Sequence, residues 1–145
     1  MPDPVILGSD HAGFALKERL KTALDRLGVP WEDAGTSSEE SVDYPDFAHR
    51  VADAVASGRF VRGVLVCGTG IGVSIAANRH PGVRAALVWD ERTARLSREH
   101  NDANVLALGG RTTDPALAER LLEIWLTTPF AGGRHGSRLA KIEAR

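Results

Sequence analysis

Short apolar runs alternate with helix-like segments along the whole chain. Four of these runs have the length and composition of strands, and a fifth contains Pro30, which is typical of an edge strand. They are residues 5–7, 29–34, 60–66, 83–89 and 104–108. We therefore predict five strands, of which 60–66 is buried on both faces because its end is continuously apolar.

The segments that separate the runs carry apolar residues at helical spacing. The predicted helices cover residues 14–27, 45–58, 70–78, 91–99, 115–127 and 137–143. Leu16, Leu20 and Leu24 mark the buried face of the first of them. Asp90 and Asp114 stand where a side chain can cap a helix, and Pro115 suits a first helical position.

This alternation predicts an α/β fold, a three-layer Rossmann-like sandwich with a five-stranded parallel sheet and helices on both faces. We expect the strand order 2-1-3-4-5 and one domain over residues 1–145. Ligands of such sheets bind beyond the carboxyl ends of the strands, where the winding reverses. The expected order places that point between strands 5–7 and 60–66.

Composition excludes several classes of protein. The single cysteine of 145 residues cannot form an internal disulfide, and the formal net charge of −1 does not favour a nucleic-acid partner. The start of the chain lacks a basic signal region, and no apolar run reaches about 18 residues, so we expect no membrane span. These features predict a cytoplasmic protein.

The segment with the clearest chemistry is residues 64–74, VLVCGTGIGVS. It predicts a buried strand, a glycine-rich turn and the start of a helix, with Cys67 where strand meets turn. Glycines at 68, 70 and 72 leave backbone N–H groups free to face an anion. One loop can therefore combine a base or nucleophile with an anion hole, although a tight turn with a buried structural cysteine explains the same pattern.

Four chemistries compete for this loop. A dinucleotide site needs G-x-G-x-x-G after the first strand, which is absent, and a phosphate-accepting aspartate would occupy the position of Cys67. A cysteine phosphatase needs arginine where Val73 stands, before Ser74. A sugar-phosphate isomerase needs a base, donors for an enediolate, an acid that opens the ring and cations for phosphate, but no metal or cofactor.

The chain resembles the ribose-5-phosphate isomerase B family, which also contains the galactose-6-phosphate isomerase subunits. The resembling segments lie in the family's order over nearly the whole chain. They are residues 8–14 (GSDHAGF), 43–45 (DYP), 67–78 (CGTGIGVSIAAN), 97–105 (SREHNDANV), 109–111 (GGR) and 132–135 (GGRH), with Arg138.

The resemblance implies a role for each matching position. Cys67 matches the base that moves a proton between sugar carbons 1 and 2, with Thr69 as a polar neighbour, and His100 matches the acid and base of ring opening. The amides from Gly68 through Gly70 and Ile71 to Gly72 match the anion hole. The other implied substrate contacts are Asp10, His11, Tyr44, Asn101, Arg111, Arg134 and Arg138.

Members of this family are dimers or dimers of dimers with active sites built from two subunits. The resemblance therefore implies a homo-oligomer in which a C-terminal segment, about residues 129–145, reaches the partner, and it implies no metal and no cofactor. His100, Asn101 and the C-terminal arginines would then serve the partner's Cys67.

Alternatives remain open. A second branch of the family carries glutamate at the position of Val73, and residues 85–89 and 127–129 are closer to that branch. The substrate is then ribose 5-phosphate or a six-carbon sugar phosphate such as allose or galactose 6-phosphate. A cysteine-dependent phosphatase and a non-catalytic sugar-phosphate-binding subunit are the other readings. Asp10 and His100 also suit plain helix capping, and Arg134 and Arg138 suit an exposed helical face.

Overall fold

The computed structural model describes residues 2–143 and contains one parallel five-stranded sheet. Its strands are β1 (Val5–Ser9), β2 (Trp31–Asp33), β3 (Arg62–Cys67), β4 (Ala85–Leu87) and β5 (Val105–Gly109). The helices are α1 (Phe14–Arg26), α2 (Tyr44–Ala56), α3 (Ile71–Ala77), α4 (Glu91–Glu99), α5 (Pro115–Thr127) and α6 (Arg134–Glu143). Among the described residues, no helix is long and apolar enough to cross a membrane.

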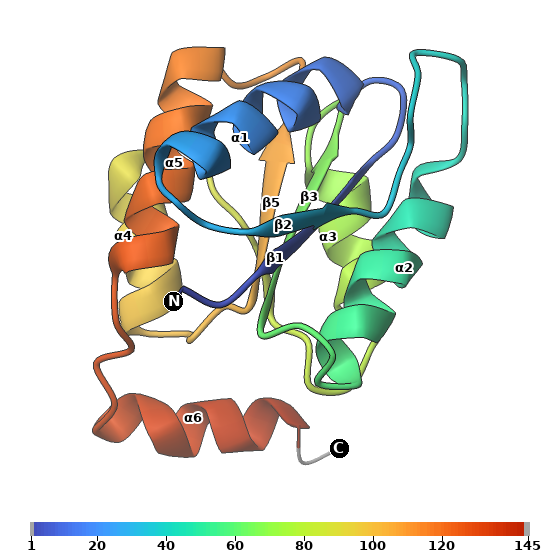
Figure 1. The fold of residues 1–145 in the computed structure, drawn as a ribbon. Helices are drawn as coiled ribbons and strands as arrows, with labels where there is room; N and C mark the ends of the chain where they lie inside the picture. Colours follow the sequence, from blue (N-terminus) through green and yellow to red (C-terminus); the bar gives the residue numbers. More distant parts are fainter. Residues whose placement is uncertain (1, 144–145) are drawn as a thin grey trace.

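Helices cover both faces of the sheet, which confirms the predicted α/β sandwich (Figure 1). Helices α1, α4 and α5 enclose one apolar cluster with the sheet, and α2 and α3 enclose the other. Because successive residues of a strand point to opposite faces, Val64 and Val66 join the first cluster and Leu65 joins the second. Helix α6 lies apart, below the edge from which the strands start (Figure 1).

The predicted strand order was wrong in one respect. The order is β2-β1-β3-β5-β4, so β5 rather than β4 lies beside β3. All five residues of β5 are buried, whereas the three residues of β4 are only half-buried. The longer apolar strand takes the position with neighbours on both sides. The outer edge of β4 pairs with a side chain, because Asn78 bonds both the N–H and the carbonyl of Ala85 at 2.8 and 3.0 Å.

Helix α6 begins three residues before the predicted start at Ser137. Gly136 lowers the helical propensity of this stretch, which hides the first turn in the sequence. The turn forms nevertheless, with the N–H groups of His135 and Gly136 donating to the carbonyls of Gly132 and Gly133. Arg134 and Arg138 therefore share one helix, as their spacing predicted.

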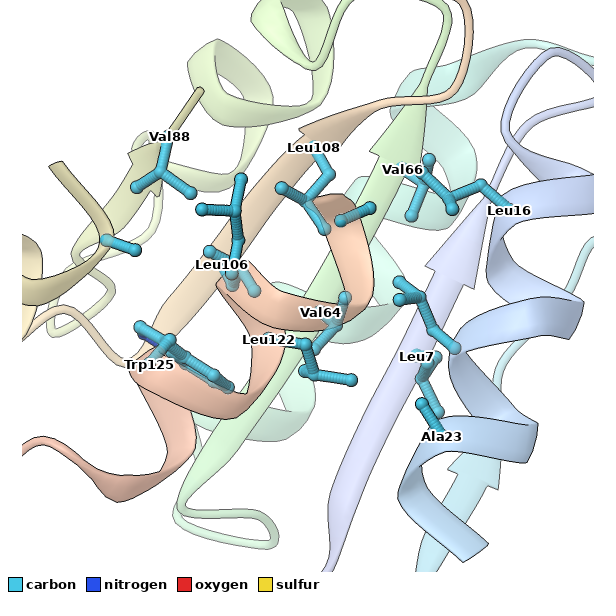
Figure 2. Close-up of a cluster of buried hydrophobic side chains, with 14 of the residues drawn as sticks. Leu7, Leu16, Ala23, Val64, Val66, Val88, Leu106, Leu108, Leu122 and Trp125 are labelled. Atoms are coloured by element: carbon cyan, nitrogen blue, oxygen red, sulfur yellow. The ribbon is translucent and has the colours of Figure 1, made fainter. Parts of the chain in front are cut away.

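The larger core is the layer between the sheet and helices α1 and α5 (Figure 2). Leu7, Val64 and Leu106 project from three adjacent strands onto Leu122 and Trp125 of α5. Trp125 is fully buried, and its indole N–H donates to the carbonyl of Ala103 at 3.0 Å. The packing of this core thus fixes the central strands, and with them the positions at which the loops after these strands begin.

Shortening a central side chain of this core should lower stability markedly. Leu106→Ala removes a fully buried side chain and should lower the free energy of unfolding by about 2–5 kcal/mol. Val61→Ala is the matched control, because Val61 is 56% exposed, and should change it by less than about 0.5 kcal/mol. Urea unfolding followed by circular dichroism measures both, and equal losses would contradict the assigned core.

Candidate active site

Three turns meet at the carboxyl edge of the sheet, after β1, β3 and β5. The N–H of Asp10 donates to the carbonyl of Val66 at 3.3 Å, and a Cβ on Gly13 would collide with that same carbonyl. On the other side, the N–H groups of Gly110 and Arg111 donate to the carbonyls of Cys67 and Gly68 at 2.8 and 2.9 Å. The residues implied by the resemblance at these turns therefore lie together.

Cys67 is the last residue of β3 and is 4% exposed. Its Sγ accepts a hydrogen bond from the N–H of Gly70 at 3.2 Å. Gly70 has a φ of +79°, and a Cβ there would lie 2.6 Å from Cδ1 of Leu87, so only glycine fits. The loop thus curls back over the sulfur and places a backbone N–H donor on it.

The same loop offers further donors beside the sulfur. The N–H of Ile71 is engaged by Oγ1 of Thr69 at 3.2 Å. The N–H groups of Gly68, Thr69 and Gly72 have no acceptor among residues 2–143. Unengaged amides in a tight loop form a concave site for an anion. These amides are therefore available to an oxyanion beside the thiol.

Two side chains flank the loop, one from the turn after β5 and one from the first residue of α2. Arg111 lies against Gly68, where a Cβ would be 3.6 Å from its Cδ and 3.8 Å from its Nη1. The ring of Tyr44 lies against Gly72, where a Cβ would be 2.5 Å from Cε1. Both residues are exposed, so they border the loop without covering it.

Asp10 and His11 occupy the turn after β1. Oδ1 of Asp10 accepts the N–H of Gly13 at 3.0 Å, which closes the turn before α1 but does not cap the helix, because Gly13 itself is the N-cap. Oδ2 of Asp10 is left for another partner. Nδ1 of His11 accepts the N–H of Val42 at 3.2 Å. The neutral ring therefore carries its proton on Nε2, which can donate to an anion.

A buried lysine behind this turn was not predicted from the sequence. Lys17 is fully buried, and its Nζ contacts Oδ1 of Asp33 at 2.5 Å and the carbonyl of Thr36 at 2.6 Å. Ser9 and the Gly35–Thr36 segment exchange backbone hydrogen bonds at 2.8 and 2.9 Å. Lys17 thus anchors the start of the loop between β2 and α2, which carries Val42 and leads to Tyr44. The sequence feature that could have predicted the burial of Lys17 is its position three residues before Leu20, on the apolar face of α1.

The remaining predicted residues lie at the opposite edge of the sheet. His100 caps the C-terminus of α4, Asn101 follows it, and Arg134 and Arg138 lie exposed on α6. Val105, which begins β5, pairs with Gly63, whereas Gly109 at its end pairs with Cys67. Strand β5 alone spans about 13 Å, so His100 cannot contact Cys67 of its own chain.

The loop after α4 is held by a small network of charges. Nη1 of Arg98, which is buried, donates to Oδ1 of Asp102 at 2.8 Å and to the carbonyl of Ala103 at 2.9 Å. Arg84 donates to the carbonyl of Asp102 at 3.0 Å. Asp102 has a φ of +45°, and these contacts hold it there. A hollow of about 590 Å³ adjoins Asn101, between the strand edge and the end of α6.

The chemistry available at the carboxyl edge is proton transfer beside a carbonyl. Cys67 supplies a thiol, the loop supplies oxyanion donors, and Arg111 and His11 supply charge and a donor for an anionic substrate. Within residues 2–143, no three His, Cys, Asp or Glu side chains gather in a geometry suited to a metal ion. The fold is thus that of an α/β protein whose carboxyl-edge turns bring together groups suited to acid–base chemistry on a small anionic substrate.

Comparison with known proteins names the family. The profile of the Ribose/Galactose Isomerase family matches residues 5–142. A putative sugar phosphate isomerase of Bacillus subtilis is 48% identical over 139 residues, which cover 95% of this chain and 93% of the relative. Ribose-5-phosphate isomerase B of Escherichia coli is 46% identical over 140 residues, covering 97% and 94%. The chain belongs to the Ribose/Galactose Isomerase family.

The fold agrees equally well with a solved structure of this family. Ribose-5-phosphate isomerase B of Clostridium thermocellum superimposes with a TM-score of 0.95 at 50% identity, covering 97% of this chain and 95% of that one. The resemblance inferred from the sequence motifs is therefore confirmed over nearly the whole chain.

The Lys17–Asp33 pair should make the free energy of unfolding depend on pH in the acid range. Burial disfavours the ionised form of Asp33, but hydrogen bonds from Lys17, Gly35 and Lys21 outweigh it and hold the pKa of this carboxyl below its usual value. The contribution of the ionised Asp33 carboxylate to the free energy of unfolding is therefore present above the pKa of the unfolded chain. It is lost as the pH falls below about 4. The gap in unfolding free energy between wild type and Asp33→Asn should shrink over that range.

Urea unfolding at a series of pH values measures this gap. Glu32→Gln is the matched control, because Glu32 is a neighbouring carboxylate whose pair with Arg59 at 3.3 Å is exposed. A gap for Asp33→Asn that stays constant from neutral to acid pH would contradict the assigned pair.

Proposed function

We propose that this protein interconverts ribose 5-phosphate and ribulose 5-phosphate through a cis-enediolate. The observation that carries the proposal is the Cys67 loop, in which a thiol that accepts the N–H of Gly70 lies among unengaged amides at the carboxyl edge of the sheet. The family membership and the names of the relatives support the same reaction. No cofactor is required by this chemistry, because the proton moves between adjacent carbons of one substrate.

Cys67 acts as the base. As a thiolate it removes the proton from carbon 2 of the open aldose, and the C–H electrons form a double bond to carbon 1 while the carbonyl electrons move to oxygen 1. The N–H groups of Gly68, Thr69 and Gly72 stabilise that oxyanion. The thiol then returns its proton to carbon 1, and the proton of hydroxyl 2 passes to oxygen 1, which leaves the ketone.

The phosphate end lies away from this loop. We place it near His11, whose Nε2 is left to donate, and near Arg134 and Arg138 of a second subunit. Arg111 lies beside the reacting end at Gly68, and Tyr44 borders the sugar at Gly72. The partner's His100 opens the sugar ring with Asp10, and the partner's Asn101 contacts a hydroxyl.

The separation of these groups along the sheet supports a site that two subunits share. Helix α3 runs from the Cys67 loop toward the opposite edge and exposes Ile71 and Ile75, which are 51% and 53% exposed on one face. Helix α3 is about 10 Å long. If two copies pack α3 against α3 around a twofold axis, each loop meets the opposite edge of its partner. Residues 129–143, which include α6, then reach across, and the last two residues of the predicted segment lie outside the described part of the chain.

The chain itself weighs against the rival readings. Val73, at the position of the phosphatase arginine and of the glutamate base, is fully buried in the core between α2 and the sheet. It cannot bind phosphate or remove a proton. We place the protein in the cytoplasm as one domain, and we assign a five-carbon rather than a six-carbon substrate from the named relatives.

Removing the thiol tests the base. Cys67→Ala should lower kcat for ribose 5-phosphate by at least about a thousandfold while the fold survives, because no other base reaches carbon 2. Coupled assay of ribulose 5-phosphate, with a chelator present throughout, measures it, and circular dichroism checks the fold.

Near-normal turnover in Cys67→Ala would show that the base is assigned wrongly. Loss of wild-type activity in chelator would contradict metal-free chemistry. Release of phosphate from an aryl phosphate, abolished by Cys67→Ser, would instead support a phosphatase. Faster turnover of allose 6-phosphate than of ribose 5-phosphate would move the assignment to six-carbon sugars.

Mixing two inactive variants tests whether the site is shared. A dimer of one Cys67→Ala chain and one His100→Ala chain contains one complete site, because its intact Cys67 and His100 come from different subunits. Unfolding and refolding the variants together should restore about a quarter of wild-type activity, as half of the dimers are mixed and each has one site of two. Each variant refolded alone is the control, and no recovery would contradict shared sites.

A further inference from the structure

The imidazole of His100 lies against a second imidazole. The rings of His100 and His135 are stacked, with centroids 4.3 Å apart and planes inclined by 18°. His100 comes from the end of α4 and His135 from the first turn of α6, so two elements that are distant in sequence bring the rings together. His135 is the one buried residue of α6, whereas its neighbours Arg134 and Arg138 are exposed.

The backbone of His100 is well fixed. Its N–H donates to the carbonyl of Leu96 at 2.9 Å, and Arg98 and Asp102 hold the loop that follows. Its ring is different, because neither ring nitrogen takes part in a side-chain hydrogen bond among residues 2–143. The stack on His135 is therefore the contact that decides how the His100 ring is turned.

His135 is suited to remain uncharged beside a ring that takes up a proton. Burial lowers the pKa of His135, and the positive charges of His100, Arg134 and Arg138 lower it further. Two stacked imidazolium rings would repel each other, whereas a neutral ring presents its π face to a charged neighbour favourably. His135 can thus stay stacked while His100 is protonated.

We propose that His135 is a positioning residue for ring opening, which holds the imidazole of His100 by stacking so that its nitrogen meets the ring oxygen of the sugar. This proposal rests on the proposed function. Opening the furanose breaks the bond between carbon 1 and oxygen 4. The proton that His100 gives to oxygen 4 is balanced by the proton that the hydroxyl on carbon 1 loses to Asp10. His135 itself exchanges no proton with the substrate.

A half-reaction separates ring opening from the chemistry of Cys67. Ribulose 5-phosphate cannot close a five-membered ring, because its hydroxyl on carbon 5 carries the phosphate. In deuterium oxide, Cys67 exchanges the hydrogen on carbon 1 of this ketose through the enediolate, and no ring opens or closes. Proton NMR follows the exchange, and the coupled assay follows net conversion of ribose 5-phosphate.

In His135→Ala, turnover of ribose 5-phosphate should fall by about ten- to a hundredfold, because a mispositioned acid loses rate of this order. Deuterium exchange into ribulose 5-phosphate should stay at the wild-type rate. In His135→Phe, most of the lost turnover should return, because a flat ring without nitrogen keeps the stack. His49→Ala is the matched control, because it removes one histidine of the other contacting pair, His49 and His80, and should change neither rate.

Several outcomes would overturn the proposal. Equal losses of turnover and exchange in His135→Ala would show a general disturbance of the subunit contact. Full loss in His135→Phe would show that a nitrogen of His135 is required, so that it acts in proton transfer. Unchanged turnover in His135→Ala would show that the stacking of His135 on His100 does not contribute to ring opening. Absence of both reactions in the wild type would refute the proposed function instead. If His135→Ala fails to fold, His135→Phe decides the matter alone.

Discussion

The close backbone contact between the turns after β1, β3 and β5 is the constraint on which the rest of the structure depends. Parallel strands end at one edge, so their turns must share a small space, and hydrogen bonds of 2.8–3.3 Å join them there. That contact requires glycine at 13 and a left-handed glycine at 70. The curl at Gly70 then places a donor on the sulfur of Cys67 and leaves neighbouring amides unengaged.

The second constraint is the length of the sheet. A βα unit sends the chain back to the starting edge of the strands, so His100 at the end of α4 and the arginines of α6 lie far from Cys67 of the same chain (Figure 1). Cys67, to which we assign proton transfer between carbons, and His100, to which we assign ring opening, are thus separated within one subunit. The exposed isoleucines of α3 lie on the path between the two edges, which is why we expect two copies to complete each other's sites.

Much of this arrangement was predictable because local chemistry and chain order agree. Apolar runs and helical periodicity predicted the parallel sheet and its layers, and glycines at 68, 70 and 72 predicted the loop around Cys67. The order of β4 and β5 was not predictable, because both are short apolar runs in sequence and differ only in how many residues the sheet buries. Lys17 was overlooked, and His135 was seen only as part of a matching segment without a role of its own, because a charged or polar residue is ordinarily taken as exposed.

The sequence by itself determined the fold class, the family and the composition of the Cys67 loop, because strand period, glycine position and residue type act over a few neighbouring residues. The tertiary structure decided which of these residues face one another. It paired Lys17 with Asp33, turned Nδ1 of His11 onto Val42 and stacked His135 on His100. Such contacts depend on the packing of elements far apart in sequence. They therefore cannot be predicted from patterns among neighbouring residues.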